Sequence, residues 1–178
     1  MDKKLPLMLR DTLISKAPTL RETISDPIYC LALGFGSGLV KKAPGTAGSF
    51  LALIFYFPLS LLPLWMYIVN LIVSFLLGIY VCGAASARLK IKDASVIVWD
   101  EFLGLWIALL FVPSGWYFIV LTFLLFRVFD ILKPWPIGYL DRELEGGIGI
   151  MLDDVAAGLF ALITLQLFVK GIASLGPS

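Results

Sequence analysis

Apolar residues dominate four long stretches of this chain, and short polar segments separate them. The stretches cover residues 47–87, 96–112, 116–132 and 150–169. A helix needs about 20 mostly apolar residues to cross a bilayer, and proline interrupts a helix. Because Pro58 and Pro63 divide the first stretch, it predicts two helices joined by a turn at residues 59–64. The pattern as a whole predicts an all-α integral membrane bundle of about five spans.

Glycine and proline mark the other boundaries. Pro113-Ser114-Gly115 predicts a turn, Pro134 and Pro136 end the following helix, and a glycine-rich segment at 146–149 precedes the last helix. Residues 27–40 carry no charge but are too few and too rich in glycine for a span, so a re-entrant or interfacial segment is predicted. The predicted organisation is a polar cytosolic leader (1–26), one membrane-embedded domain (27–170) and a short tail (171–178).

Composition agrees with a membrane protein, because 60% of the 178 residues are hydrophobic and 15% are charged. Thirteen of the 14 lysines and arginines fall on one side of the predicted spans, and Lys170 falls on the other. Positive residues mark the cytoplasmic side. Four tryptophans are predicted to anchor the helices at the membrane interface: Trp99, Trp106, Trp116 and Trp135.

Several kinds of chemistry are excluded. The chain has no histidine, which removes histidine bases, histidine-dependent nucleophiles and histidine-ligated zinc. Cys30 and Cys82 are isolated, so neither a disulfide framework nor a cysteine metal site is predicted. The net charge of +1 does not indicate binding to nucleic acid.

Five carboxylates lie inside the predicted spans, where charged groups are costly and usually functional. They are Asp100, Glu101, Asp130, Asp153 and Asp154. The predicted topology puts all five at one depth, just inside the cytoplasmic interface. Carboxylates gathered in a small volume repel one another unless a cation lies among them. An all-oxygen ligand set favours Mg²⁺, with Mn²⁺ as a substitute, and charge pairing that only fixes helix packing is the alternative.

Two further features suit an anion. Arg127 and Lys133 each lie three residues from Asp130, where they either pair with that carboxylate or bind an anion. The segment Pro44-Gly45-Thr46-Ala47-Gly48-Ser49 opens the first full span after Lys41 and Lys42. Such a turn presents free backbone N–H groups to a phosphate, or else only caps the helix with small, closely packed residues. A metal site beside a phosphate site at a membrane surface indicates phosphoryl hydrolysis or transfer on a lipid.

From about residue 33 to 159 the chain resembles the phosphatidylglycerophosphatase A family of bacterial inner membranes. The motifs GFGSGL, APGTAGS, IVWDEFLGLW, FRVFDILKPWPI and GGIGIMLDDVAAG carry the resemblance, in order and with matching spacing. The resemblance implies a helical, multi-pass, Mg²⁺-dependent enzyme with its active site at the cytoplasmic face. It also implies hydrolysis of phosphatidylglycerophosphate to phosphatidylglycerol and inorganic phosphate, a step in phospholipid biosynthesis.

For individual residues, the resemblance implies one metal-binding and catalytic set and one phosphate-binding set. The first is Asp100, Glu101, Asp130, Asp153 and Asp154, and the second is Thr46, Ser49, Arg127 and Lys133. The nucleophile is either water activated by the metal or the carboxylate of Asp154 or Asp100. A non-enzymatic divalent-cation transporter is the alternative function, because acidic groups can also line an ion path.

Overall fold

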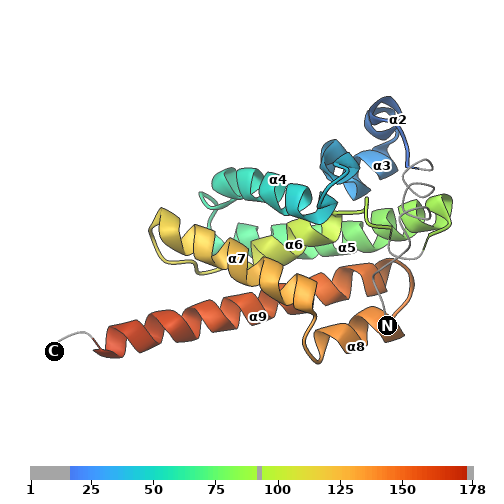
Figure 1. Cartoon of the computed structure of the whole chain (residues 1–178). Helices are drawn as coiled ribbons and strands as arrows, with labels where there is room; N and C mark the ends of the chain where they lie inside the picture. Colours follow the sequence, from blue (N-terminus) through green and yellow to red (C-terminus); the bar gives the residue numbers. More distant parts are fainter. Residues whose placement is uncertain (1–16, 92–93, 176–178) are drawn as a thin grey trace.

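The computed structural model describes residues 17–91 and 94–175, and these residues form helices and connecting loops without a β-strand (Figure 1). The predicted all-α class is therefore confirmed. In chain order the helices are α2 (Leu20–Ser25), α3 (Pro27–Ala32), η1 (Gly34–Leu39), α4 (Pro44–Leu59), α5 (Leu64–Leu89), α6 (Trp99–Ala108), α7 (Trp116–Leu132), α8 (Ile137–Glu143) and α9 (Gly146–Leu175).

The predicted turns are confirmed in the structure. α4 ends at Leu59 and α5 begins at Leu64, on either side of the predicted turn. Gly115 takes a positive φ of 129° directly before α7, a conformation that favours glycine. α7 ends where Lys133 enters the left-handed region and Pro134 follows.

The prediction that the last helix starts near residue 150 is wrong, because α9 begins at Gly146. Gly147 lies against the carbonyl of Ile79 and the backbone N–H of Gly83 on α5, so closely that a side chain there would collide with α5. This tertiary contact outweighs the weak helix propensity of glycine. α9 also continues to Leu175, through the first residues of the segment assigned to the tail.

The shortest of the five apolar helices lies at the centre of the fold. α6 packs against α4, α5, α7 and α9, and eight of its ten residues are buried. Figure 1 shows α6 lying among these four helices. Ten residues rise about 15 Å, half the thickness of a bilayer core, so α6 cannot cross a membrane.

Among the described residues, two helices are long and apolar enough to span a membrane, not the five expected. These are α5, with 26 residues, and α9, with 30. α4 has 16 residues and α7 has 17, slightly short of a full span. Large apolar side chains are exposed along α4, α5, α7 and α9, which suits a surface that faces lipid.

The N-terminal segment at 27–40 folds into α3 and η1, each with six residues, so neither crosses a membrane. Asp26 caps α3 by accepting hydrogen bonds from the backbone N–H groups of Ile28 and Tyr29. The same carboxylate pairs with Arg88 at the end of α5, with a nitrogen–oxygen distance of 2.6 Å. This pair ties the N-terminal helices to the bundle. The first sixteen residues of the predicted leader lie outside the described residues.

The prediction of interfacial anchors is wrong for two of the four tryptophans. Trp99 and Trp106 are buried in α6, where their indole N–H groups donate to the carbonyls of Ser74 on α5 and Ala52 on α4. These hydrogen bonds fix α6 against its neighbours, which a single sequence does not reveal. Trp116 and Trp135 are 76% and 82% exposed, as an interfacial position requires.

Two glycines bring α6 and α9 into close contact. The Cα position of Gly158 faces the backbone carbonyl of Gly104, and a β-carbon at Gly158 would collide with that oxygen. A β-carbon at Gly104 would in turn come within 2.7 Å of the carbonyl oxygen of Asp154. Small residues permit this approach of two backbones in membrane helices.

We expect Gly158→Ala to destabilise the bundle by about 1–3 kcal/mol, because the added methyl group forces α6 and α9 apart. Thermal unfolding in detergent should show a midpoint several degrees lower. Gly171→Ala on the same helix is the matched control, because nothing lies within 4 Å of its β-carbon position. Equal midpoints for the two variants would refute the close crossing.

Candidate metal and phosphate site

Three carboxylates from two helices meet at one end of the bundle. Asp100 and Glu101 lie in the first turn of α6, and Asp154 lies in the third turn of α9. One oxygen from each lies within 4.8 Å of the other two, an arrangement that could hold a metal ion. Asp154 is 2% exposed, so it is shielded from bulk water.

The close contact of Gly104 on α6 with Gly158 on α9, here called the glycine crossing, determines how the acids of the two helices meet. Asp100 precedes Gly104 by four residues, and Asp154 precedes Gly158 by four, so each acid lies one turn from the crossing on the same helix face. Since the acids converge on the same side of the crossing, α6 and α9 run in the same direction. The crossing therefore fixes the distance between the acidic groups of the two helices.

Asp130 joins this cluster from α7 together with Arg127. Arg127 Nη1 lies 2.7 Å from Asp130 Oδ2 and 4.0 Å from Glu101 Oε1. Asp130 is also close enough to Asp154 for their charges to interact. The guanidinium is thus a positive group at the edge of a strongly acidic site, which reduces the repulsion among the carboxylates.

The fifth acid is paired with the second predicted cation. Lys133, which caps the C-terminus of α7 in the left-handed conformation, donates to Asp153 Oδ2 on α9. Asp153 Oδ1 also accepts a hydrogen bond from the backbone N–H of Asp154, at 3.0 Å. The structure therefore gathers all five predicted acids and both predicted cations at one end of the bundle.

The N-terminus of α4 forms another wall of the site. Gly45 is buried against Glu101, and a β-carbon on Gly45 would collide with Glu101 Oε1. The same β-carbon would lie 3.3 Å from Arg127 Nη2. No side chain among the described residues caps the first turn of α4, so its backbone N–H groups are available to an anion.

The two hydroxyls of this segment are placed differently. Ser49 is fully buried, and its Oγ donates to the carbonyl of Gly45 at 2.8 Å and accepts from Arg127 Nη1 at 3.2 Å. Thr46 is exposed in the first turn of α4. Ser49 therefore contacts Arg127 directly, whereas the structure does not bring Thr46 into contact with the acidic cluster.

We expect Ser49→Ala to reduce kcat/KM for a lipid phosphate about tenfold, because Arg127 loses a hydrogen bond that holds its guanidinium in place. Ser60→Ala is the matched control. Ser60 Oγ also donates to a carbonyl of its own helix turn, that of Phe57, but at the opposite end of α4. Initial rates of phosphate release would test this, and equal rates for both variants would argue against a role for Ser49.

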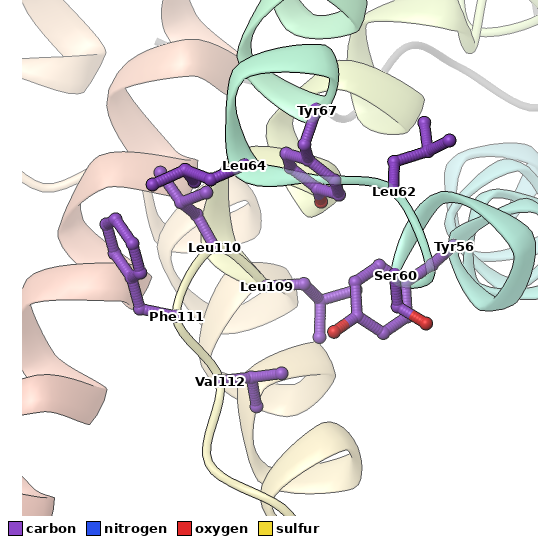
Figure 2. Close-up of a pocket in the computed structure, with 9 residues that line it drawn as sticks. All are labelled: Tyr56, Ser60, Leu62, Leu64, Tyr67, Leu109, Leu110, Phe111 and Val112. Carbon is purple, nitrogen blue, oxygen red and sulfur yellow. The ribbon is translucent and has the colours of Figure 1, made fainter.

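A separate pocket of about 240 Å³ opens between the end of α4, the start of α5 and the residues that follow α6 (Figure 2). Figure 2 shows leucines, Phe111, Val112, Tyr56, Tyr67 and Ser60 around it. Tyr67 donates its hydroxyl to the carbonyl of Trp106 at 2.8 Å. The lining contains no charged residue, and the acids of the candidate site lie at the other ends of α4 and α6.

Sequence reasoning missed the contribution of the glycines. Gly104 and Gly158 set the helix crossing, and Gly45 makes room for the Glu101 carboxylate. The spacing Asp-x-x-x-Gly in both IVWDEFLGLW and GGIGIMLDDVAAG was a usable signal, because a small residue one turn from an acid permits close packing beside it.

The fold and the site define a class: within its described residues this is an all-α protein with two potential membrane spans and a buried acidic cluster that could hold a metal ion. A sequence model of the family described as phosphatidylglycerophosphatase A matches residues 30–169. The chain belongs to the phosphatidylglycerophosphatase A family, as its motifs predicted.

Two individual relatives carry the name of this family, and a third is named for a different lipid phosphatase. The chain is 46% identical over 150 residues to the phosphatidylglycerophosphatase A of Haemophilus influenzae, covering 83% of this chain and 92% of the relative. It is 40% identical over 142 residues to the enzyme of the same name from Escherichia coli K12, covering 79% and 83%. A Bacteroides thetaiotaomicron protein named as a candidate phosphatidylinositol-3-phosphatase is 38% identical over 143 residues, covering 76% and 89%.

No solved structure matches the chain. Since the family and both enzymes above are named for a lipid phosphatase, the comparisons support the predicted enzyme rather than the alternative of a cation transporter.

Proposed function

We propose that this protein hydrolyses phosphatidylglycerophosphate to phosphatidylglycerol and inorganic phosphate, with Mg²⁺ bound by the acidic cluster. The observation that carries the proposal is the convergence of Asp100, Glu101 and Asp154 within 4.8 Å, beside the guanidinium of Arg127. An anionic phosphomonoester needs positive charge around it, and a hard cation with an arginine supplies that charge.

The residues fit Mg²⁺. Glu101 Oε2 and Asp154 Oδ2 are buried and have no hydrogen-bond partner within the described part of the chain. A buried carboxylate oxygen without a partner is costly, and a bound cation would remove that cost. The available ligands are all carboxylate oxygens, which Mg²⁺ prefers. Asp100, Glu101 and Asp154 would hold the ion directly, with Asp130 and Asp153 beside them.

In this proposal the phosphate group lies between the acidic cluster and the first turn of α4. The backbone N–H groups of that turn and the forked donors of Arg127 bind its oxygens. Asp130 and Ser49 orient Arg127, and the ammonium group of Lys133 adds positive charge from the end of α7. Thr46 contributes through its backbone N–H or its exposed hydroxyl.

Bound Mg²⁺ would supply charge that neutralises the phosphate oxygens as the bond to the leaving group breaks. Water attacks phosphorus, the bond between phosphorus and the glycerol oxygen breaks, and that oxygen gains a proton. We favour water over the carboxylate of Asp154 or Asp100, because these two carboxylates are needed as ligands. A single turnover in water labelled with heavy oxygen should place the label in inorganic phosphate, and label in a protein carboxylate would contradict water attack.

We further propose that residues 27–170 form one catalytic domain in the bacterial inner membrane. α5 and α9 cross the bilayer fully, α4 and α7 insert beside them, and α6 is enclosed by the bundle. The acidic cluster then lies at the cytoplasmic side, where most of the positive residues are found. This arrangement puts the site at the depth of a lipid phosphate.

The test is phosphate release by the purified protein from three lipids, with Mg²⁺ and with a chelator. We expect the highest kcat/KM with phosphatidylglycerophosphate, lower values with phosphatidylinositol-3-phosphate and phosphatidic acid, and no release in the chelator. A protein that prefers either of the other lipids, or that is equally active without divalent cations, would refute the proposal.

A further inference from the structure

An apolar surface continues from α4 onto the N-terminal helices. Leu20 and Ile24 lie one turn apart on α2 and are 57% and 63% exposed. Leu20 touches the neighbouring helix, since a β-carbon on Gly36 in η1 would lie 2.9 Å from its Cδ1 atom. α2 packs on η1 and η1 packs on α4, and Figure 1 shows these helices beside the N-terminal end of α4.

Phe35 joins this surface to the lipid-facing side of α4. Its φ of 54° is unusual for a bulky residue and is maintained by surrounding contacts. In this conformation the ring of Phe35 stacks on that of Phe55, with centroids 5.4 Å apart. Both side chains are exposed, as are Phe50 and Ile54 on α4. The exposed side of α2 is therefore continuous with a surface that suits lipid tails.

Positive charge borders the same surface. Lys41 and Lys42 are exposed in the loop between η1 and α4, directly before the turn that contacts Glu101 and Arg127. Arg21 is also exposed on α2, and Glu22 is the one acid in that helix. Lysines that flank a membrane-facing apolar surface attract anionic lipids, each with about 1 kcal/mol near the surface.

We propose that α2, η1 and the Lys41-Lys42 loop form a surface that lies on the anionic leaflet of the bilayer and gathers anionic lipid at the entrance of the site. We call this the leaflet surface. Leu20, Ile24 and Phe35 insert among the lipid tails, and the two lysines contact lipid phosphates. This inference rests on the proposed function, because the gathered lipid includes the substrate.

The first experiment measures substrate affinity in phosphatidylcholine vesicles that contain phosphatidylglycerophosphate as the one anionic lipid. We expect Lys41→Gln/Lys42→Gln to raise KM about 5- to 25-fold with kcat unchanged at 0.1 M salt. The increase should nearly vanish at 1 M salt, where charges are screened beyond about 3 Å. Lys90→Gln/Lys170→Gln, which removes the same charge from two exposed positions elsewhere, should leave KM within twofold.

A short-chain, water-soluble substrate distinguishes two roles for the lysines. If they act on the leaflet, the double variant should cleave this substrate as well as the unaltered protein does. An equal rise in KM for the soluble substrate would mean that the lysines contact the substrate phosphate itself, which would overturn the proposal. So would an unchanged KM in vesicles.

The second experiment does not depend on catalysis, so it separates failure of this inference from failure of the proposed function. A nitroxide label at Ile24→Cys, in a Cys30→Ser/Cys82→Ala background, should be more accessible to oxygen than to a water-soluble nickel complex. Ser95→Cys, at an exposed position in the loop before α6, is the control and should show the reverse. Two results would refute the proposed leaflet surface. The Ile24 label could be more accessible to the nickel complex than to oxygen, or it could be accessible to neither reagent because a second copy or another protein covers it.

Discussion

Asp154→Asn should lower kcat for phosphatidylglycerophosphate by at least a thousandfold while the protein remains folded. The amide has the size of the carboxylate but binds Mg²⁺ far more weakly. Since Asp154 is buried beside several other acids, neutralising it should also relieve repulsion and keep or raise the thermal midpoint of the metal-free protein. Activity would then fall without a loss of stability, as at many functional sites.

The measurement is phosphate release together with thermal unfolding, each with and without Mg²⁺. The unaltered protein should gain stability from Mg²⁺, because an ion that binds the folded state stabilises it, and Asp154→Asn should lose most of that gain. Glu143→Gln is the control, since Glu143 is an exposed acid on α8. Activity of Asp154→Asn within tenfold of this control would remove Asp154 from the site.

Arg127→Met should give the second-largest effect, a loss of about 10²–10³ in kcat. Its guanidinium lies 2.7 Å from Asp130 Oδ2 and 4.0 Å from Glu101 Oε1, and removing one donor to a transition state of this kind typically has an effect of this size. The kcat of Arg127→Lys should lie between those of Arg127→Met and the unaltered protein, because lysine keeps the charge but lacks the forked donors. Arg142→Met, at an exposed arginine on α8, should be near normal.

Arg127→Met should also lower the thermal stability of the metal-free protein. The Arg127–Asp130 pair is partly buried, so removing Arg127 leaves the Asp130 charge poorly compensated and should cost less than the about 3–5 kcal/mol typical of a fully buried pair. We therefore expect Arg127→Met to unfold at a lower temperature in the absence of Mg²⁺ and to recover partly when Mg²⁺ is added. If Arg127→Met and Arg127→Lys were equally active, the phosphate-binding role of the guanidinium would be wrong.

The sequence predicted the helices well where proline or glycine marks their ends, as at the turn before Leu64 and at Pro134. It failed on the spans because hydropathy does not distinguish lipid contact from protein contact. α6 is apolar because it is enclosed by four other helices, and its tryptophans face carbonyls of α4 and α5 rather than the interface. That difference lies in tertiary packing.

The candidate site was predictable in its members but not in its arrangement. Charged residues inside apolar stretches stand out, so all five acids, Arg127 and Lys133 could be found in the sequence. The pairing of Arg127 with Asp130 was one of the two alternatives predicted from their spacing on α7, and the structure shows that pair. The pairing of Lys133 with Asp153 on α9 depends on which helix faces cross. Ser49 accepts a hydrogen bond from Arg127, so its hydroxyl is not directed into an open phosphate site. This contact depends on how closely α4 approaches α7, which the sequence does not show.

The relative named for phosphatidylinositol-3-phosphate adds a reason to test head groups. A cluster of acids with an arginine can serve any lipid phosphomonoester, so selection must come from groups around the site entrance. The leaflet surface concentrates anionic lipids of every kind and should not discriminate among their head groups. Selectivity and substrate capture are therefore separable, and the lysine variants should change KM for all lipid substrates alike.

Asp100, Glu101 and Asp154 are proposed to bind the divalent cation on which phosphate release depends. Electron paramagnetic resonance of Mn²⁺ tests this assignment most directly, because the sharp signal of the free ion disappears when the ion binds. We predict at least one tightly bound Mn²⁺ per chain in detergent, displaced by excess Mg²⁺, and none in Asp100→Asn/Asp154→Asn. Equal binding by the unaltered protein and this double variant would contradict the assignment of these carboxylates as metal ligands.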